Sequence, residues 1–133
     1  MLKTGLKGVN FFEWLKLRRY VLFSLRINTV NLIQVRQVNE LLGVRSNYSK
    51  EDWYLEVVQK EDDPPFRFID YFLSLLEGKY ERLESIGISR EDISIWVLYE
   101  YEGQCNMKYD PVSMKKIGEN GIVLCISCWE KEG

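Results

Sequence analysis

Residues 92–129 have the sequence DISIWVLYEYEGQCNMKYDPVSMKKIGENGIVLCISCW, and this stretch decides the fold. Its opening part, Ile93–Glu102, alternates a fully apolar side with a mixed side, which is the pattern of a β-strand. Its closing part, Ile122–Trp129, is rich in β-branched residues that suit a pleated, half-buried surface. Between them, Asp110 and Pro111 are typical of a helix N-cap and a first helical residue. The stretch therefore predicts a strand, a helix and a strand as one continuous unit.

The helix of this unit is predicted to run from Asp110 to Glu119. It should stop at Gly121, because glycine readily takes the left-handed conformation that ends a helix. Met114 and Ile117 lie one turn apart, and we expect both to face inward. The two flanking strands are strongly apolar, which indicates that both are central strands of a sheet.

A strand and a helix are predicted ahead of this unit. Tyr20–Ile27 alternates strongly apolar residues with less apolar ones, which indicates a strand with one buried side. Asn31, followed by Gln34 three residues later, resembles a helix cap, and an apolar stripe continues from there to Gly43. Because Gly43 is a typical stop, we expect a helix over Leu32–Leu42.

The next strand is predicted over Trp53–Gln59, where apolar residues alternate with mixed ones. Arg45–Tyr48 is a candidate short hairpin partner for this strand. Pro64 and Pro65 then interrupt the chain, because two successive prolines cannot continue a ladder of backbone hydrogen bonds. This break separates the strand from a long helical segment.

The longest helix is predicted from Phe66 to Ile86. Its apolar stripe at helical spacing consists of Ile69, Phe72, Leu73, Leu76, Tyr80 and Leu83. Gly87 is the expected left-handed stop. Gly78 lies inside this segment, where glycine costs roughly 1 kcal/mol relative to alanine, so it indicates either a close contact with the sheet or a bend.

These elements predict an α+β fold in two layers. We expect a ferredoxin-like variant with a mixed, largely antiparallel sheet of about four or five strands and helices mainly on one face, because this packing buries every apolar stripe with few chain crossings. A single α+β domain is predicted over residues 20–133. Residues 1–19 would form an amino-terminal extension, in which Asn10 and Glu13 have the spacing of a capping box and Phe11–Arg19 would make a short amphipathic helix.

Composition narrows the classes of partner. The chain has 133 residues, a formal net charge of -2 and no histidine, so nothing in its charge suggests a nucleic acid or an anionic membrane. No stretch approaches the roughly 20 apolar residues of a membrane span, and charged residues interrupt the apolar run where a signal peptide would have its core. Three cysteines without an export signal indicate reduced thiols, and we expect a cytoplasmic location.

Three features together resemble a known family. They are a helix end at Glu40-Leu41-Leu42-Gly43-Val44, a strand with Trp53-Tyr54-Leu55 ahead of a long helix, and the segment from Tyr109-Asp110-Pro111 through Gly121 to Ile126. On these grounds Val21–Trp129 resembles the small bacterial proteins grouped as domain of unknown function 4279. The resemblance implies an α+β fold and a bacterial cytoplasmic setting, and it carries over no catalytic residues.

Cys125 and Cys128 have the C-x-x-C spacing of redox sites and zinc knuckles. Residues three apart on a strand point to opposite faces, however, and without histidine the chain lacks the ligands of a complete zinc site. We therefore expect buried structural thiols, no metal and no cofactor. The absence of histidine also excludes Ser-His and Cys-His catalysis.

Glu100 and Glu102 are the best candidates for carboxylate catalysis. They lie on one side of the predicted strand, roughly 7 Å apart, so one could act as acid and the other as base. A small carboxylate-based hydrolase is therefore the alternative function. The same two glutamates are also explained by a solvent-exposed strand end that has no catalytic role.

The mixed side of the sheet offers the stronger clue to function. Its apolar residues, which would gather away from the helices, are Leu22, Trp96, Leu98, Val123, Cys125 and Trp129. Monomeric proteins rarely leave such a patch bare, so we expect the helix over Phe11–Arg19, a second copy of the chain or another protein to cover it. The sequence thus favours a non-enzymatic protein-binding module of the immunity or regulatory type, partnered by another protein or by itself as a homodimer. Its candidate binding residues are Trp96, Leu98, Trp129, Glu100 and Glu102.

Overall fold

The structure is a computed structural model that describes residues 20–47, 52–60 and 62–131. The strands of its sheet are β1 (Tyr20–Ile27), β2 (Trp53–Lys60), β3 (Ile93–Tyr101) and β4 (Val123–Glu130). The helices of the described residues are α2 (Leu32–Leu42), α3 (Phe68–Leu76), α4 (Tyr80–Ser85) and α5 (Pro111–Asn120), and a 3-10 turn, η2 (Arg90–Asp92), precedes β3. The predicted extension at residues 1–19, with its helix over Phe11–Arg19, lies outside the described residues.

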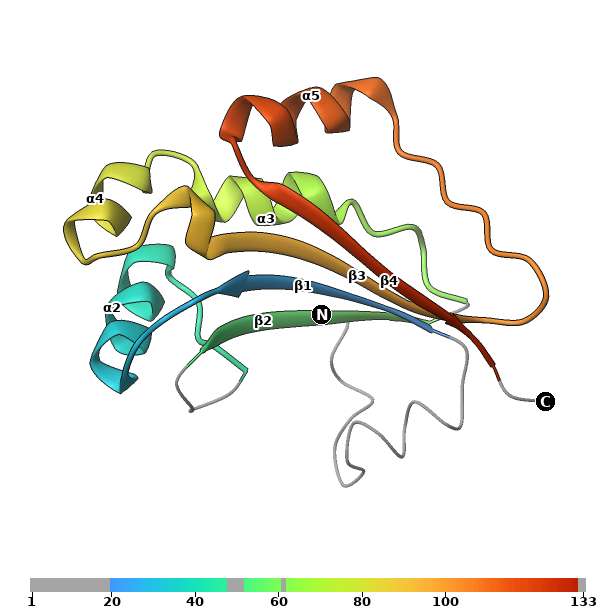
Figure 1. The fold of residues 1–133 in the computed structure, drawn as a ribbon, viewed down its shortest axis with the longest axis horizontal. Helices are drawn as coiled ribbons and strands as arrows, with labels where there is room; N and C mark the ends of the chain where they lie inside the picture. Colours follow the sequence, from blue (N-terminus) through green and yellow to red (C-terminus); the bar gives the residue numbers. More distant parts are fainter. Residues whose placement is uncertain (1–19, 48–51, 61, 132–133) are drawn as a thin grey trace.

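The four strands form one mixed sheet in the order β2-β1-β3-β4 (Figure 1). β1 is antiparallel to both of its neighbours, whereas β3 and β4 are parallel. Leu25 near the middle of β1 lies opposite Leu55 of β2 and Ile95 of β3. The predicted α+β fold with a largely antiparallel mixed sheet is confirmed, and the fold is ferredoxin-like in its count of strands.

The helices and the sheet make two layers around one apolar core. Figure 1 shows α3 and α5 side by side over the sheet, with α2 and α4 together at one end of it. The fully buried side chains that meet between the layers include Leu25, Ile27, Val38, Trp53, Phe72, Leu76, Leu83, Ile93, Ile95 and Val97. Each buried side chain of this size stabilises the fold by about 1.5–3 kcal/mol relative to an exposed one, so this interface is the main source of stability.

Local chemistry sets the ends of α2 and α5. The Asn31 side chain accepts the Gln34 N–H at 2.9 Å, and Gly43 ends α2 with a left-handed φ of 72°. For α5, the Asp110 side chain accepts the N–H of residue 113 at 2.8 Å, and Gly121 ends the helix with φ 68°. Both predicted caps and both predicted stops are therefore confirmed.

Two buried polar side chains are satisfied by bonds between elements. Gln34 at the start of α2 accepts the Val30 N–H at 2.8 Å and donates to the carbonyl of Ile86 at 2.7 Å, which ties α2 to the end of α4. The indole N–H of Trp53, a side chain with 0% exposure, donates to the Asn39 side chain at 2.8 Å. A buried indole N–H without a hydrogen-bond partner would destabilise the fold. The bond between Trp53 and Asn39 therefore fixes β2 and α2 to each other.

The prediction of one helix from Phe66 to Ile86 is wrong. The chain leaves the helical conformation at Glu77, with ψ 126°, and Gly78 takes a left-handed φ of 73°. A second short helix, α4, begins at Tyr80 and is followed by Gly87 at φ 92°. The apolar stripe continues across the break because α3 and α4 both pack on the core, so periodicity alone did not reveal two helices.

Three smaller predictions also fail. Met114 does not face inward but is 36% exposed, because α5 buries only the side that carries Ser113 and Ile117. Residues 45–47, the described part of the predicted hairpin partner at 45–48, form no strand. Among the strands that the structure describes, β4 has only β3 as a neighbour, so it is an edge strand and not a central one.

Candidate functional site

Most of the predicted binding residues share the face of the sheet that points away from the helices, which we call the second face. Trp96, Leu98 and Glu100 alternate with the buried residues of β3, so they lie on this face and are half-buried. Trp129 of β4 lies beside Glu100 in the register and is 41% exposed. The structure therefore brings these four residues together, as the alternation of the sequence predicted.

The middle of the second face is not a bare apolar surface. Leu22, Ser24 and Val58 lie there with exposed fractions of 3%, 0% and 1%. The predicted cover by Phe11–Arg19 concerns residues outside the described part of the chain. Exposed apolar side chains occur instead along β4, where Val123 at the start of the strand is 53% exposed and Trp129 near its end is 41% exposed.

Arg26 is a residue of the second face that sequence analysis did not select. Its guanidinium carbon lies 4.5 Å from the ring centroid of Trp96 and 5.1 Å from that of Tyr54. Its Nε donates to the hydroxyl of Ser24 at 3.3 Å. Cation–π contacts of this kind stabilise by about 0.5–2 kcal/mol, so Arg26 holds β2 and β3 to β1 across the face. Only the pairing of three strands that lie far apart in the sequence reveals this cluster.

The candidate carboxylates Glu100 and Glu102 are not held as a matched pair. β3 ends at Tyr101, so Glu102 lies beyond the strand, where it is exposed. Its carboxylate is 3.6 Å from the Nζ of Lys131, in an ion pair that joins the ends of β3 and β4. The hydrolase alternative stays a prediction, which Glu100→Gln and Glu102→Gln would test against any activity found by substrate screening.

β4 presents an open row of backbone groups at one edge of the sheet. The N–H of Lys131 donates inward to the Tyr101 carbonyl at 2.7 Å. Because backbone groups alternate in direction along a strand, the even-numbered residues of β4 direct theirs outward. These residues are Leu124, Ile126, Cys128 and Glu130. Within residues 20–47, 52–60 and 62–131, no hydrogen bond reaches their outward groups.

The opposite edge of the sheet, along β2, is closed over Tyr54–Glu56. The Tyr54 N–H donates to the Ser46 hydroxyl at 3.0 Å, and the Asn47 N–H donates to the Tyr54 carbonyl at 2.6 Å. The Asn47 side chain also accepts the N–H of Glu56. The segment ahead of β2 thus occupies backbone groups that would otherwise attract another strand.

The sequence of β4 contains none of the usual protections of an exposed edge. Natural edge strands are blunted by lysine, proline, a bulge or a covering loop. β4 reads VLCISCWE, with no proline and with its single charge at the last residue, Glu130. Its edge therefore suits the addition of another strand more than the edge of β2 does.

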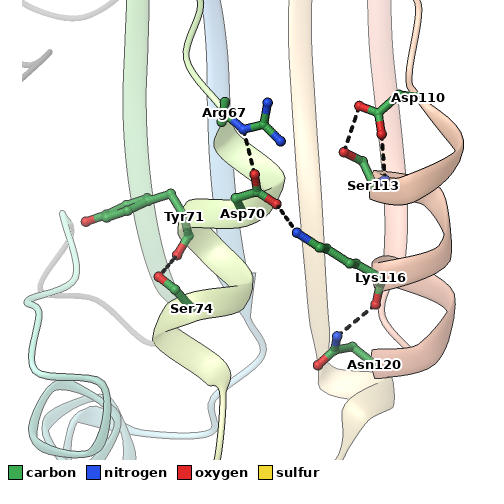
Figure 2. Close-up of polar contacts among 8 residues, drawn as sticks. All are labelled: Arg67, Asp70, Tyr71, Ser74, Asp110, Ser113, Lys116 and Asn120. Atoms are coloured by element: carbon green, nitrogen blue, oxygen red, sulfur yellow. Dashed lines mark hydrogen bonds and ion pairs between the residues drawn. The ribbon is translucent and has the colours of Figure 1, made fainter.

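A polar groove between α3 and α5 is the other candidate site. Figure 2 shows the carboxylate of Asp70 between two cations: it accepts from the Arg67 Nε at 2.6 Å and from the Lys116 Nζ at 2.9 Å. These bonds lower the pKa of Asp70, the one from Lys116 contributing most. The hollows on either side of Asp70 measure about 390 and 280 Å³.

The second carboxylate of the groove is engaged in capping α5. Asp110 accepts the N–H and the hydroxyl of Ser113 at 2.8 and 3.0 Å, and the backbone bond is the main cause of its lowered pKa. A carboxylate with a lowered pKa is a weak base at neutral pH. The groove is therefore explained by helix packing and capping, and its residues give no sign of acid–base catalysis.

The cysteines do not form a C-x-x-C site. Cys125 lies beside Trp96 on the second face, and Cys128 lies beside Tyr99 on the helix side, as the strand argument predicted. All three thiols are free. The prediction that Cys125 and Cys128 are buried is wrong, because they lie on an outer strand of the described sheet, where Cys125 is half-buried and Cys128 is exposed. Desolvation raises the pKa of Cys105, with a smaller contribution from nearby Cys128. In the described part of the chain, no group of three histidine, cysteine or acidic residues is placed to hold a metal ion.

No family model, curated protein or solved structure matches this chain. The resemblance to domain of unknown function 4279 therefore stays a prediction. None of the helices among the described residues is long and apolar enough to cross a bilayer. The fold and its edges are thus the basis for any inference about function.

Proposed function

We propose that this chain is a non-enzymatic protein-binding module that receives an extended strand of its partner on the outer edge of β4. The observation that carries the proposal is the contrast between the two edges of the sheet: Ser46 and Asn47 close β2 over Tyr54–Glu56, whereas no described residue bonds to the outer edge of β4. In strand addition, backbone hydrogen bonds supply affinity and alternate side chains supply specificity. We propose that this binding serves an immunity-type or regulatory role.

The side chains of β4 support the same function. Val123, Ile126 and Trp129 are 53%, 46% and 41% exposed, so apolar groups are available on both faces of the edge. Tryptophan is enriched among the residues that dominate binding energy at protein interfaces. An added strand would cover Trp129 on the second face and Ile126 on the helix side.

Capture of partners from a lysate of the native host tests the proposal. Ile126→Pro removes an outward N–H and leaves the inward bonds to β3 intact, because proline is tolerated on the open side of an edge strand. Val30→Lys is the matched control, since Val30 is 77% exposed but lies in the turn before α2.

We expect the wild-type chain and Val30→Lys to capture the same protein, and Ile126→Pro to lose it. That protein is either the chain itself or a different one. Equal capture by all three variants, or capture by none, would contradict a binding function of the β4 edge. Thermal unfolding of each variant verifies that it is folded.

A further inference from the structure

We infer that the strand received by β4 is β4 of a second copy, so that two chains form a two-fold dimer with one continuous sheet. This inference rests on the proposed function and names its partner. Two-fold pairing uses the same surface on both copies, so β4 of each chain becomes the neighbouring strand of β4 in the other. The pairing therefore covers both open edges at once.

The directions of the backbone groups restrict the register of this pair. In an antiparallel pair, outward-directed residues must face outward-directed residues to exchange their hydrogen bonds. The register that uses the whole strand places Ser127 on the two-fold axis. Ile126 then lies opposite Cys128 of the second copy, and Leu124 lies opposite its Glu130.

This register gives about eight backbone hydrogen bonds, because four outward residues on each strand offer one donor and one acceptor each. Protein interfaces typically contain about 10 ± 5 hydrogen bonds. A strand of this length extends for roughly 27 Å at about 3.4 Å per residue. The backbone alone therefore provides a number of bonds typical of a specific interface.

The side chains of β4 match one another in the same register. On the second face, Trp129 lies opposite Cys125 of the second copy, so the exposed indole gains an apolar neighbour. On the helix side, Ile126 meets Cys128. Cross-strand apolar pairs stabilise a strand pair relative to alanine pairs, and two serines at the axis can hydrogen-bond through their hydroxyls.

Charge favours a second copy as the occupant. Like charges directly opposite each other destabilise a strand pair. In this register Glu130 faces Leu124 and Lys131 faces Val123, so no like charges meet and all charges remain at the two ends. β4 is thus complementary to itself in apolarity, in hydrogen bonding and in charge.

A disulfide trap tests the register directly. In a background with Cys105→Ala, Cys125→Ala and Cys128→Ala, the variant Ser127→Cys places one thiol of each copy at the axis. A pair without mutual hydrogen bonds has Cα atoms about 4.5 Å apart, which lies within the range for a disulfide. Val123→Cys in the same background is the control, because the two copies of residue 123 would lie at opposite ends of the interface.

With oxidised glutathione as the oxidant, the two thiols lose two protons and two electrons and form one disulfide, while one glutathione disulfide becomes two glutathione thiols. We expect the Ser127→Cys chain to become a covalent dimer on a non-reducing gel and the Val123→Cys chain to stay a monomer. Equal cross-linking of the two variants, or of neither, overturns the register.

Sedimentation of the full chain tests the dimer itself. We expect the wild-type chain and Val30→Lys to reach twice the monomer mass as concentration rises, and Ile126→Pro to stay at the monomer mass. Ile126→Lys is a second variant for the case that proline unfolds the chain. A wild-type monomer at every concentration overturns the dimer. If that monomer still captures another protein in an Ile126-dependent way, the proposed function stands, and without such capture both fail.

Discussion

Gly78 and Gly118 are exposed glycines around which an added Cβ would meet nothing within 4 Å, yet their backbones differ. Gly78 has a left-handed φ of 73°, whereas Gly118 lies inside α5 without a positive φ. An L-residue in the left-handed conformation is strained by roughly 1–2 kcal/mol, and glycine inside a helix costs about 0.5–1 kcal/mol relative to alanine.

The two alanine substitutions should therefore act in opposite directions. Gly78→Ala is expected to lower the free energy of unfolding by about 1 kcal/mol, and Gly118→Ala to raise it by up to about 1 kcal/mol. Urea unfolding at neutral pH measures both. A stabilising effect of Gly78→Ala would show that the chain does not turn at this residue.

Residues whose role depends on near neighbours were predicted well. Asn31 and Asp110 were identified as caps because each cap bond joins residues only three positions apart. The prediction that Met114 faces inward was wrong. An apolar stripe shows which side of a helix faces the core, but it does not show how much of that side the sheet covers. Arg26 was missed because its aromatic partners come from two other strands.

At the scale of elements, Asp70 joins α3 to α5 through Lys116. Its lowered pKa means that the folded state favours the ionised carboxylate. This contribution to stability is therefore present above the ordinary pKa of 3.8 and is lost as pH falls through the lower folded-state pKa.

Asp70→Asn should accordingly lower the urea midpoint at neutral pH, and the difference from wild type should shrink as the solution is acidified below 3.8. Asp62→Asn removes the same charge from an exposed residue and is the control. A difference that stays constant across this pH range would mean that the ionised carboxylate contributes nothing specific.

The packing of α3 on β3 is tested by Leu76→Ala and Val97→Ala, whose side chains are 0% and 1% exposed. We expect losses of about 2–4 and 1–3 kcal/mol, because each change removes buried methyl groups and leaves a cavity. Leu32→Ala, at a side chain that is 45% exposed, is the control and should cost far less. Unchanged urea midpoints for both core variants would contradict the two-layer arrangement.

Helices were predicted correctly where one short segment contains both the apolar periodicity and the caps. α2 and α5 lie within a residue of their predicted bounds, because apolar periodicity and caps occur in the same few residues. At Gly78 a bend was one of the two predicted alternatives, but the separation into two helices was not predicted, because the apolar stripe of α3 and α4 is continuous across it. Likewise, β4 has the apolar sequence of a central strand, and its position at the edge follows only from the order of the sheet.

At the scale of the whole molecule, the sheet has two unlike edges. Ser46 and Asn47 close the β2 edge over Tyr54–Glu56, and this closure depends largely on side-chain bonds between a connection and a strand. The β4 edge is open in the described part of the chain and exposes apolar side chains on both faces. The site residue Trp129 was selected from the sequence for its place on the second face, but the backbone row beside it became evident only from the strand order.

Residue-resolved amide exchange along β4, measured over a range of protein concentrations, tests this edge most directly. The inward N–H groups of Cys125 and Ser127 should exchange slowly at every concentration, because β3 holds them. The outward N–H groups of Ile126 and Cys128 should exchange fast in dilute protein and become protected as the two strands pair. Outward groups that are slow even in dilute protein would mean that the chain covers its own edge, and outward groups that stay fast at every concentration would mean that β4 does not pair with itself.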